Sequence, residues 1–144
     1  MAHIEKWINI EENGIYLVFG VTEENQLKFL HFSSKPFEGL NESELFMKEG
    51  FQLVQVNFSG YNRPYEKHGI KHIVTAPGYL LTFVDLKDER NETGRKLTFI
   101  QKDEMTGAKV ITYWQFYQGT SVIRMYNEVI NEGSEEQTLE YLSS

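Results

Sequence analysis

Two histidines four residues apart, His68 and His72, have the spacing of a helical metal site. Gly69 and the β-rich residues that follow disfavour a helix at this position. On a strand, residues four apart lie about 13 Å from each other at ~3.3 Å per residue. One ion cannot reach both imidazoles over that distance, so we expect no metal here and assign the histidines hydrogen-bonding or packing roles.

A second group of candidate residues is an acidic cluster made of Asp85, Asp88, Glu89 and Glu92. Paired carboxylates could act as general acid and base or bind calcium, but their spacing does not match an EF-hand loop. The segment 87–96 also supplies further Arg and Lys side chains that can pair with these acids. The sequence therefore predicts a charged, solvated loop with internal ion pairs.

A third group lies in the polar, aromatic loop 59–69, between two predicted strands. Its candidate substrate-adjacent residues are Asn62, Arg63, Tyr65 and His68. An aromatic face stacks on the C–H face of a pyranose, while planar donors and acceptors bind its hydroxyls. The alternative is an ordered structural loop, in which Arg63 pairs with Glu66 and the tyrosines pack underneath.

Several function classes are excluded or disfavoured by what the chain lacks. It contains no cysteine, which excludes thiol catalysis, thiolate zinc sites and disulfides, and fits a reducing cytosol. No nucleophile motif of the Gly-x-Ser-x-Gly kind and no phosphate-binding glycine loop is present. We therefore expect no cofactor and no nucleophilic catalysis.

Charge and hydropathy disfavour two classes of partner. The net charge is −7 and neither half contains a basic block, so nucleic acid is a poor partner. The longest apolar run, residues 15–19, is far shorter than the ~20 residues of a membrane helix. The N-terminus lacks the pattern of an export signal. We expect a cytoplasmic protein that binds neither nucleic acid nor membrane.

The composition is typical of an all-β protein, because branched and aromatic side chains suit a half-buried sheet. Val, Ile, Thr, Phe, Tyr and Trp make up one third of the chain, whereas Ala occurs three times. Two β-rich runs, 108–117 and 120–131, flank Gln118-Gly119 and predict a tight hairpin with Gly119 at positive φ. Both faces of 108–117 carry large side chains, which predicts a central strand covered on both sides.

Period-two alternation predicts eight further strands and thus an antiparallel β-sandwich. Asn13-Gly14 and residues 22–26 should join the first three as a meander. A polar cap and a final Gly predict one short helix over 41–50. No repeat or linker is present, so residues 1–144 are expected to form a single domain. The further strands are 5–11, 15–21, 27–32, 51–58, 72–75, 80–86, 95–102 and 138–142.

Several motifs occur in one order along the chain: Asn62-Arg63, 72–78 (HIVTAPG), 88–97 (DERNETGRKL), 113–117 (YWQFY) and 139–144 (LEYLSS). In this order they resemble the N-terminal region of bacterial α-galactosidases (melibiases) of glycoside hydrolase family 36. The resemblance runs from about Ile15 to the last residue. It implies the N-terminal part of a β-supersandwich domain, galactose mutarotase-like, of the kind that precedes a catalytic (β/α)₈ barrel.

The catalytic nucleophile and acid/base of this family are barrel aspartates, so the resemblance assigns no catalytic residue to this chain. It implies a non-catalytic, truncated module that packs on the barrel and takes part in homo-oligomer assembly. The galactoside substrate would be only an indirect partner of this module. The loop at Asn62, Arg63 and Tyr65 would approach the rim of a substrate site. In that role Arg63 would donate hydrogen bonds to hydroxyls and Tyr65 would supply a stacking surface.

Three further expectations accompany this interpretation. An independent carbohydrate-binding module is one alternative, given that 14% of residues are aromatic, although most of these alternate within strands. A small mutarotase-like enzyme is another, and it would need Glu66 with His68 or His72 at an anomeric centre. The final strand 138–142 has no successor to pair with, which predicts edge-to-edge self-association.

Overall fold

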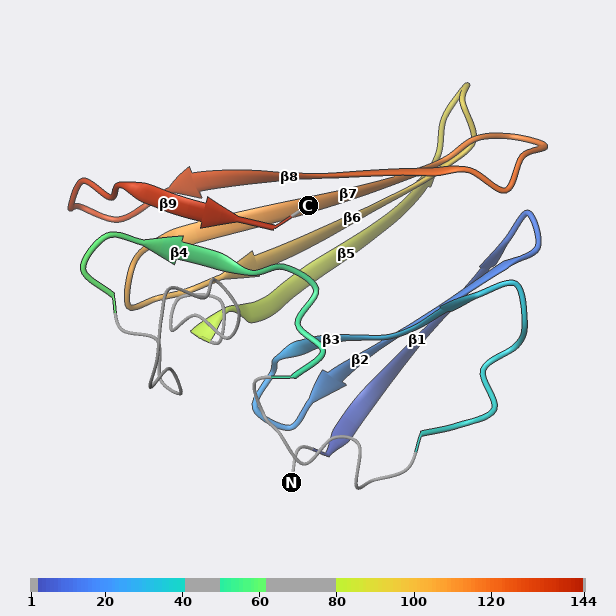
Figure 1. The fold of residues 1–144 in the computed structure, drawn as a ribbon, viewed down its shortest axis with the longest axis horizontal. Coiled ribbons are helices and arrows are strands. Elements are labelled where there is room, and N and C mark those ends of the chain that lie inside the picture. The colour runs from blue at the N-terminus through green and yellow to red at the C-terminus, as the bar shows by residue number, and fades with distance from the viewer. Residues whose placement is uncertain (1–2, 41–49, 62–79, 144) are drawn as a thin grey trace.

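The computed structural model describes residues 3–40, 50–61 and 80–143, which form nine β-strands in three antiparallel sheets (Figure 1). The sheet orders are β1-β2-β3, β4-β9 and β5-β6-β7-β8. The predicted antiparallel, all-β sandwich is confirmed. The strands are β1 (Ile4–Glu12), β2 (Ile15–Thr22), β3 (Leu27–Ser33), β4 (Val56–Phe58), β5 (Thr82–Arg90), β6 (Arg95–Lys102), β7 (Ala108–Phe116), β8 (Ile123–Asn131) and β9 (Leu139–Leu142).

The inner face of the four-stranded sheet takes part in two hydrophobic clusters. Trp114 and Phe116, near one end of β7, pack with the inner face of the β1–β3 sheet. Ala108 and Val110, near the other end, pack with β4 and its neighbours. Thr112 lies between these pairs, buried and hydrogen-bonded through its hydroxyl. Figure 1 accordingly shows the β1–β3 sheet and the β4–β9 ribbon toward opposite ends of the β5–β8 sheet.

The hairpin turns agree in part with prediction. Asn13 and Gly14 both have positive φ, at 52° and 76°, as a tight β1–β2 hairpin requires. Gly119 also has positive φ, but the tight two-residue hairpin is wrong, because the β7–β8 connection spans 117–122. Ser121 in this connection donates a hydrogen bond to the Asn13 backbone oxygen at 3.0 Å. The longer connection thus reaches the tip of the β1–β2 hairpin.

The largest differences from the predicted strand boundaries concern two strands. The run 51–58 forms a strand only at Val56–Phe58. Phe51 has φ of 60° and its carbonyl accepts a hydrogen bond from the amide of Phe29, and Gln52 forms an isolated bridge with Lys28. β5 continues to Arg90, so residues 87–90 are paired with β6 and do not form the predicted loop. The predicted strand 72–75 and all but the last residue of the predicted helix 41–50 lie outside the described residues.

Two predictions about neighbours are also corrected. β7 is central in its sheet, but among the described residues only its inner face is buried, and Ile111 and Tyr113 on the outer face are half-exposed. The final strand is expected to be left at an edge because no strand follows it, but it pairs with an earlier strand, β4. The edge-to-edge self-association inferred from it stays a prediction. β9 runs antiparallel to β4, with Leu142 opposite Val56 and Tyr141 opposite Asn57.

Candidate functional site

Of the predicted substrate-adjacent loop 59–69, only residues 59–61 belong to the described part of the chain. Asn62, Arg63, Tyr65 and His68 all lie outside the described residues, as do Glu66 and His72 of the mutarotase alternative. The structure therefore neither brings these side chains together nor separates them. Among the described residues, the candidate chemistry lies where the β5–β6 hairpin meets the β1–β2 hairpin.

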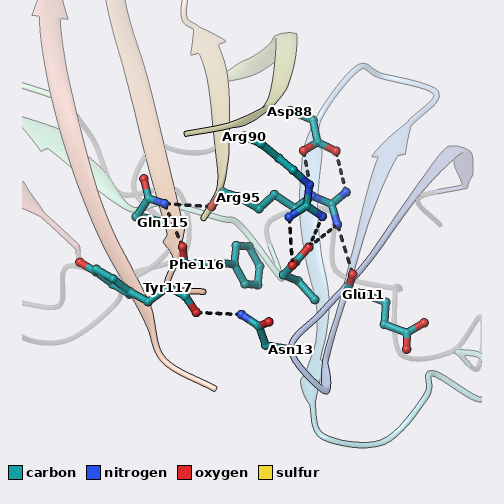
Figure 2. A network of polar contacts seen from close by, with 9 residues as sticks. Glu11, Asn13, Asp88, Arg90, Arg95, Gln115, Phe116 and Tyr117 are labelled. Atoms are coloured by element: carbon teal, nitrogen blue, oxygen red, sulfur yellow. Dashed lines mark hydrogen bonds and ion pairs between the residues drawn. The ribbon is translucent and has the colours of Figure 1, made fainter. Parts of the chain in front are cut away.

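At this junction the acidic residue Asp88 of β5 is bound by Arg95 of β6. Arg95 Nε donates to Asp88 Oδ1 at 2.8 Å and Nη2 donates to Oδ2 at 2.6 Å, so the pair is bidentate (Figure 2). The side chain of Arg95 is 17% exposed. The predicted ion pairing within the acidic segment is therefore confirmed for this pair.

The same junction contains an acid that sequence reasoning missed, Glu12 at the end of β1. Arg90 Nη2 donates to Glu12 Oε2 at 2.9 Å, and Arg95 Nη1 donates to the same oxygen at 3.3 Å. Arg95 Nη1 also reaches the backbone oxygen of Glu11 at 3.2 Å. We call Glu12, Asp88, Arg90 and Arg95 the arginine clamp, because they join the two larger sheets.

The charges of the clamp fix the protonation of its acids. Hydrogen bonding from Arg90, aided by Arg95, lowers the pKa of Glu12 despite partial burial. Hydrogen bonding from Arg95 likewise lowers the pKa of Asp88. Hydrogen bonding to Asp88, with help from Glu12, raises the pKa of Arg95. Both carboxylates are ionised at neutral pH, so neither is suited to donate a proton in catalysis.

An open pocket of about 290 Å³ lies beside the clamp, lined by Glu12, Asn13, Arg90, Asn91, Gly94 and Gln118. Several of the polar groups that line it already form hydrogen bonds within the protein. Asn13 Nδ2 donates to the Tyr117 backbone oxygen at 2.9 Å, and Asn91 Oδ1 accepts from two backbone amides of its own turn. Arg90 remains mostly exposed. The pocket can offer hydrogen bonds to a small polar molecule, but no aromatic side chain lines it.

A close approach of backbone shapes this pocket. Gly94 has φ of 150°, and a Cβ at this position would collide with the backbone oxygen of Phe116. Gln118 N donates to Thr93 O at 2.9 Å next to it. Glycine therefore lets the β5–β6 turn lie against the end of β7.

Aromatic residues on the outer face of the β5–β8 sheet are already in contact with one another. The rings of Tyr113 and Tyr126 stack with centroids 4.6 Å apart. Lys96 Nζ lies 4.8 Å from the Tyr113 centroid, and the Arg124 guanidinium lies 5.6 Å from that of Tyr126. Stacking and cation–π contacts use these ring faces, so the pair does not form a flat, vacant platform for a sugar.

Residues 3–40, 50–61 and 80–143 contain no group of three or more His, Asp or Glu side chains arranged to hold a metal ion. Within the same ranges there is no apolar helix of membrane-spanning length.

Comparisons with known proteins add no identification. A scan against models of protein families, a search of curated proteins and a search of solved structures each found no match.

Proposed function

We propose that the chain is a non-catalytic β-sandwich module of a family 36 α-galactosidase, an enzyme that hydrolyses terminal α-galactosides such as melibiose and raffinose. Support comes from the sequence motifs that resemble this family and occur in the same order along the chain, and from the antiparallel sandwich fold. In this role the module packs on a catalytic barrel and neighbouring subunits in the cytoplasm. The loop at Asn62, Arg63, Tyr65 and His68 would lie near the rim of the substrate site.

The observation that best supports a non-catalytic role is the ionisation of the two acids in the arginine clamp. A retaining glycosidase needs two carboxyl groups about 5–5.5 Å apart, one of which must be protonated to donate to the leaving group. Glu12 and Asp88 share Arg95, and the pKa of each is lowered by arginine. This supports a structural use of the acids.

The first test is catalytic. The purified chain should release no phenol from an aryl α-galactoside, whereas an intact family 36 α-galactosidase assayed in parallel should hydrolyse it. The second test is assembly with such an enzyme from which the corresponding N-terminal region has been deleted. We expect the two chains to co-sediment. Turnover by the isolated chain would contradict the proposal.

An independent carbohydrate-binding module is the second candidate, and the open pocket beside the clamp is the observation in its favour. Arg90 and Gln118 line this pocket and can donate hydrogen bonds to hydroxyls. Titration of the chain with galactose, followed by nuclear magnetic resonance, separates the two candidates. Millimolar or tighter binding at the pocket favours a binding module, and unchanged spectra favour a structural one.

A further inference from the structure

β8 is an edge strand with one open side. Among the described residues it pairs with β7 alone, and it borders its sheet in Figure 1. Its nine residues pair in unbroken register from Ile123 to Asn131, without a bulge. It contains neither proline nor lysine. A long, regular edge of this kind is a template for pairing with another strand.

Two other edge strands of the larger sheets, β5 and β1, are less suited to such pairing. β5, at the opposite edge of the same sheet, has a register shift between Phe83 and Asp85, and its last four residues, 87–90, are all charged. β1 has a register shift between Ile4 and Lys6. Bulges and charges on an edge oppose pairing with a further strand. β8 carries no such bulge.

Backbone hydrogen bonds at the ends of β8 show which of its groups point outward. Tyr117 N donates to Val122 O, and Glu132 N donates to Gly107 O. Since hydrogen-bonded positions alternate along an antiparallel pair, the even-numbered residues of β8 direct their backbone groups at β7. Odd-numbered residues direct theirs to the open side: Ile123, Met125, Asn127, Val129 and Asn131.

Side chains of the even-numbered residues lie on the outer face, and three of them form a symmetric pattern. Arg124 and Glu128 lie two residues before and two residues after Tyr126, and all three are exposed. Arg124 forms no ion pair with a described residue and lies over the Tyr126 ring. Glu128 accepts a hydrogen bond from the Tyr113 hydroxyl at 3.1 Å. The pattern reads positive, aromatic, negative along the strand.

We propose that β8 pairs antiparallel with β8 of a second copy of this chain, with Tyr126 opposite the partner's Tyr126. In this register Arg124 lies opposite the partner's Glu128, and Glu128 lies opposite the partner's Arg124. These positions are not hydrogen-bonded, so their side chains approach most closely. The two-fold axis makes every contact reciprocal and joins two four-stranded sheets into one in a closed dimer.

Backbone groups and charges select this register over its neighbours. The odd-numbered residues exchange backbone hydrogen bonds, Ile123 with the partner's Val129 and Met125 with the partner's Asn127. Sliding the partner by two residues removes both ion pairs. Sliding it by four residues places Arg124 opposite the partner's Arg124, or Glu128 opposite the partner's Glu128, and like charges directly opposite destabilise a sheet. The proposal rests on the β8 edge and needs no property of an α-galactosidase.

Sedimentation equilibrium of the whole chain, from low to high micromolar concentration, is the first test. The chain should dimerise, and Arg124→Glu should weaken dimerisation by about tenfold or more, because both ion pairs become repulsive. The double reversal Arg124→Glu with Glu128→Arg should restore it. Lys87→Glu is the matched control, since it makes the same charge change on the opposite edge strand, and it should leave dimerisation unchanged.

A cross-linking experiment tests the register directly, because the chain contains no cysteine of its own. Tyr126→Cys should form a disulfide-linked dimer on mild oxidation, whereas Ile130→Cys, four residues along the same face, should not. Urea unfolding of each variant verifies that the fold is retained. A monomeric wild-type chain, a double reversal as weak as the single one, or equal cross-linking at both positions would overturn the proposal.

Discussion

At the scale of single residues, Arg95 joins the two larger sheets. Its guanidinium binds both oxygens of Asp88 on β5 and also reaches Glu12 on β1. The side chain of Arg95 is 17% exposed, whereas that of Arg90 is 68% exposed. An ion pair shielded from solvent is screened less by salt than an exposed pair. The two arginines should therefore differ in their contribution to stability.

Arg95→Met should lower the free energy of unfolding by about 1–2 kcal/mol, because it removes the donor shared by the largely buried Glu12 carboxylate and the more exposed Asp88 carboxylate. Arg90→Met should lower it by less than about 1 kcal/mol, as is usual for an exposed pair. Urea unfolding of both variants measures the difference. Equal losses would show that the shielding of Arg95 has no energetic consequence.

At the scale of elements, the β5–β6 hairpin depends on the close approach of its turn to β7. Gly94→Ala should lower the unfolding free energy by about 1–3 kcal/mol, because the new Cβ meets the backbone oxygen of Phe116 at an unfavourable φ. Gly14→Ala is the control, since Gly14 also has positive φ but has open space around it. Thermal unfolding should show the larger loss at Gly94, and the reverse order would refute this account.

Alternation of side chains predicted most of the described strands, because period two is a local property of the sequence. β6 begins and ends at the predicted residues, 95 and 102. Prediction failed where contacts with residues far away in the sequence determine the backbone conformation. Phe51 leaves the strand conformation and its carbonyl accepts from the amide of Phe29. The 117–122 connection likewise departs from a tight turn and contacts the β1–β2 hairpin.

The arginine clamp was predictable only in part for the same reason. Asp88 and Arg95 are seven positions apart on one hairpin, so local charge patterning suggested their pairing. Glu12 is 78 positions from Arg90, and no local signal connects them. The edge pattern of β8 was present in the sequence, but its meaning required knowing that β8 borders its sheet.

At the scale of the whole molecule, the clamp makes the contact between sheets sensitive to acid. The pKa values of Glu12 and Asp88 are lowered in the folded chain, chiefly by hydrogen bonds from Arg90 and Arg95 respectively. Their stabilisation is therefore complete above the ordinary carboxyl range and is lost as the pH falls through the lowered values. Neutral and alkaline conditions leave it intact.

Glu12→Gln should test this dependence. The unfolding free energies of wild type and variant should differ most near neutral pH and converge as the pH falls below about 4, because protonation removes the charge from wild-type Glu12 as well. Urea unfolding across a pH series measures the gap. Asp85→Gln is the control, since Asp85 lies on the same exposed hairpin outside the clamp. A gap that stays constant with pH would contradict the assignment.

The division of the buried interior along β7 has a consequence for how the protein fluctuates. Of the residues that the structure describes, twelve buried ones form the cluster on the Trp114 side and six form the cluster on the Ala108 side, and the polar Thr112 separates the two along the strand. A local opening that detaches the short β4–β9 ribbon would thus expose the cluster on the Ala108 side to solvent, while the cluster on the Trp114 side stays buried. In such an event β7, which contributes side chains to both clusters, would stay packed at its Trp114 end.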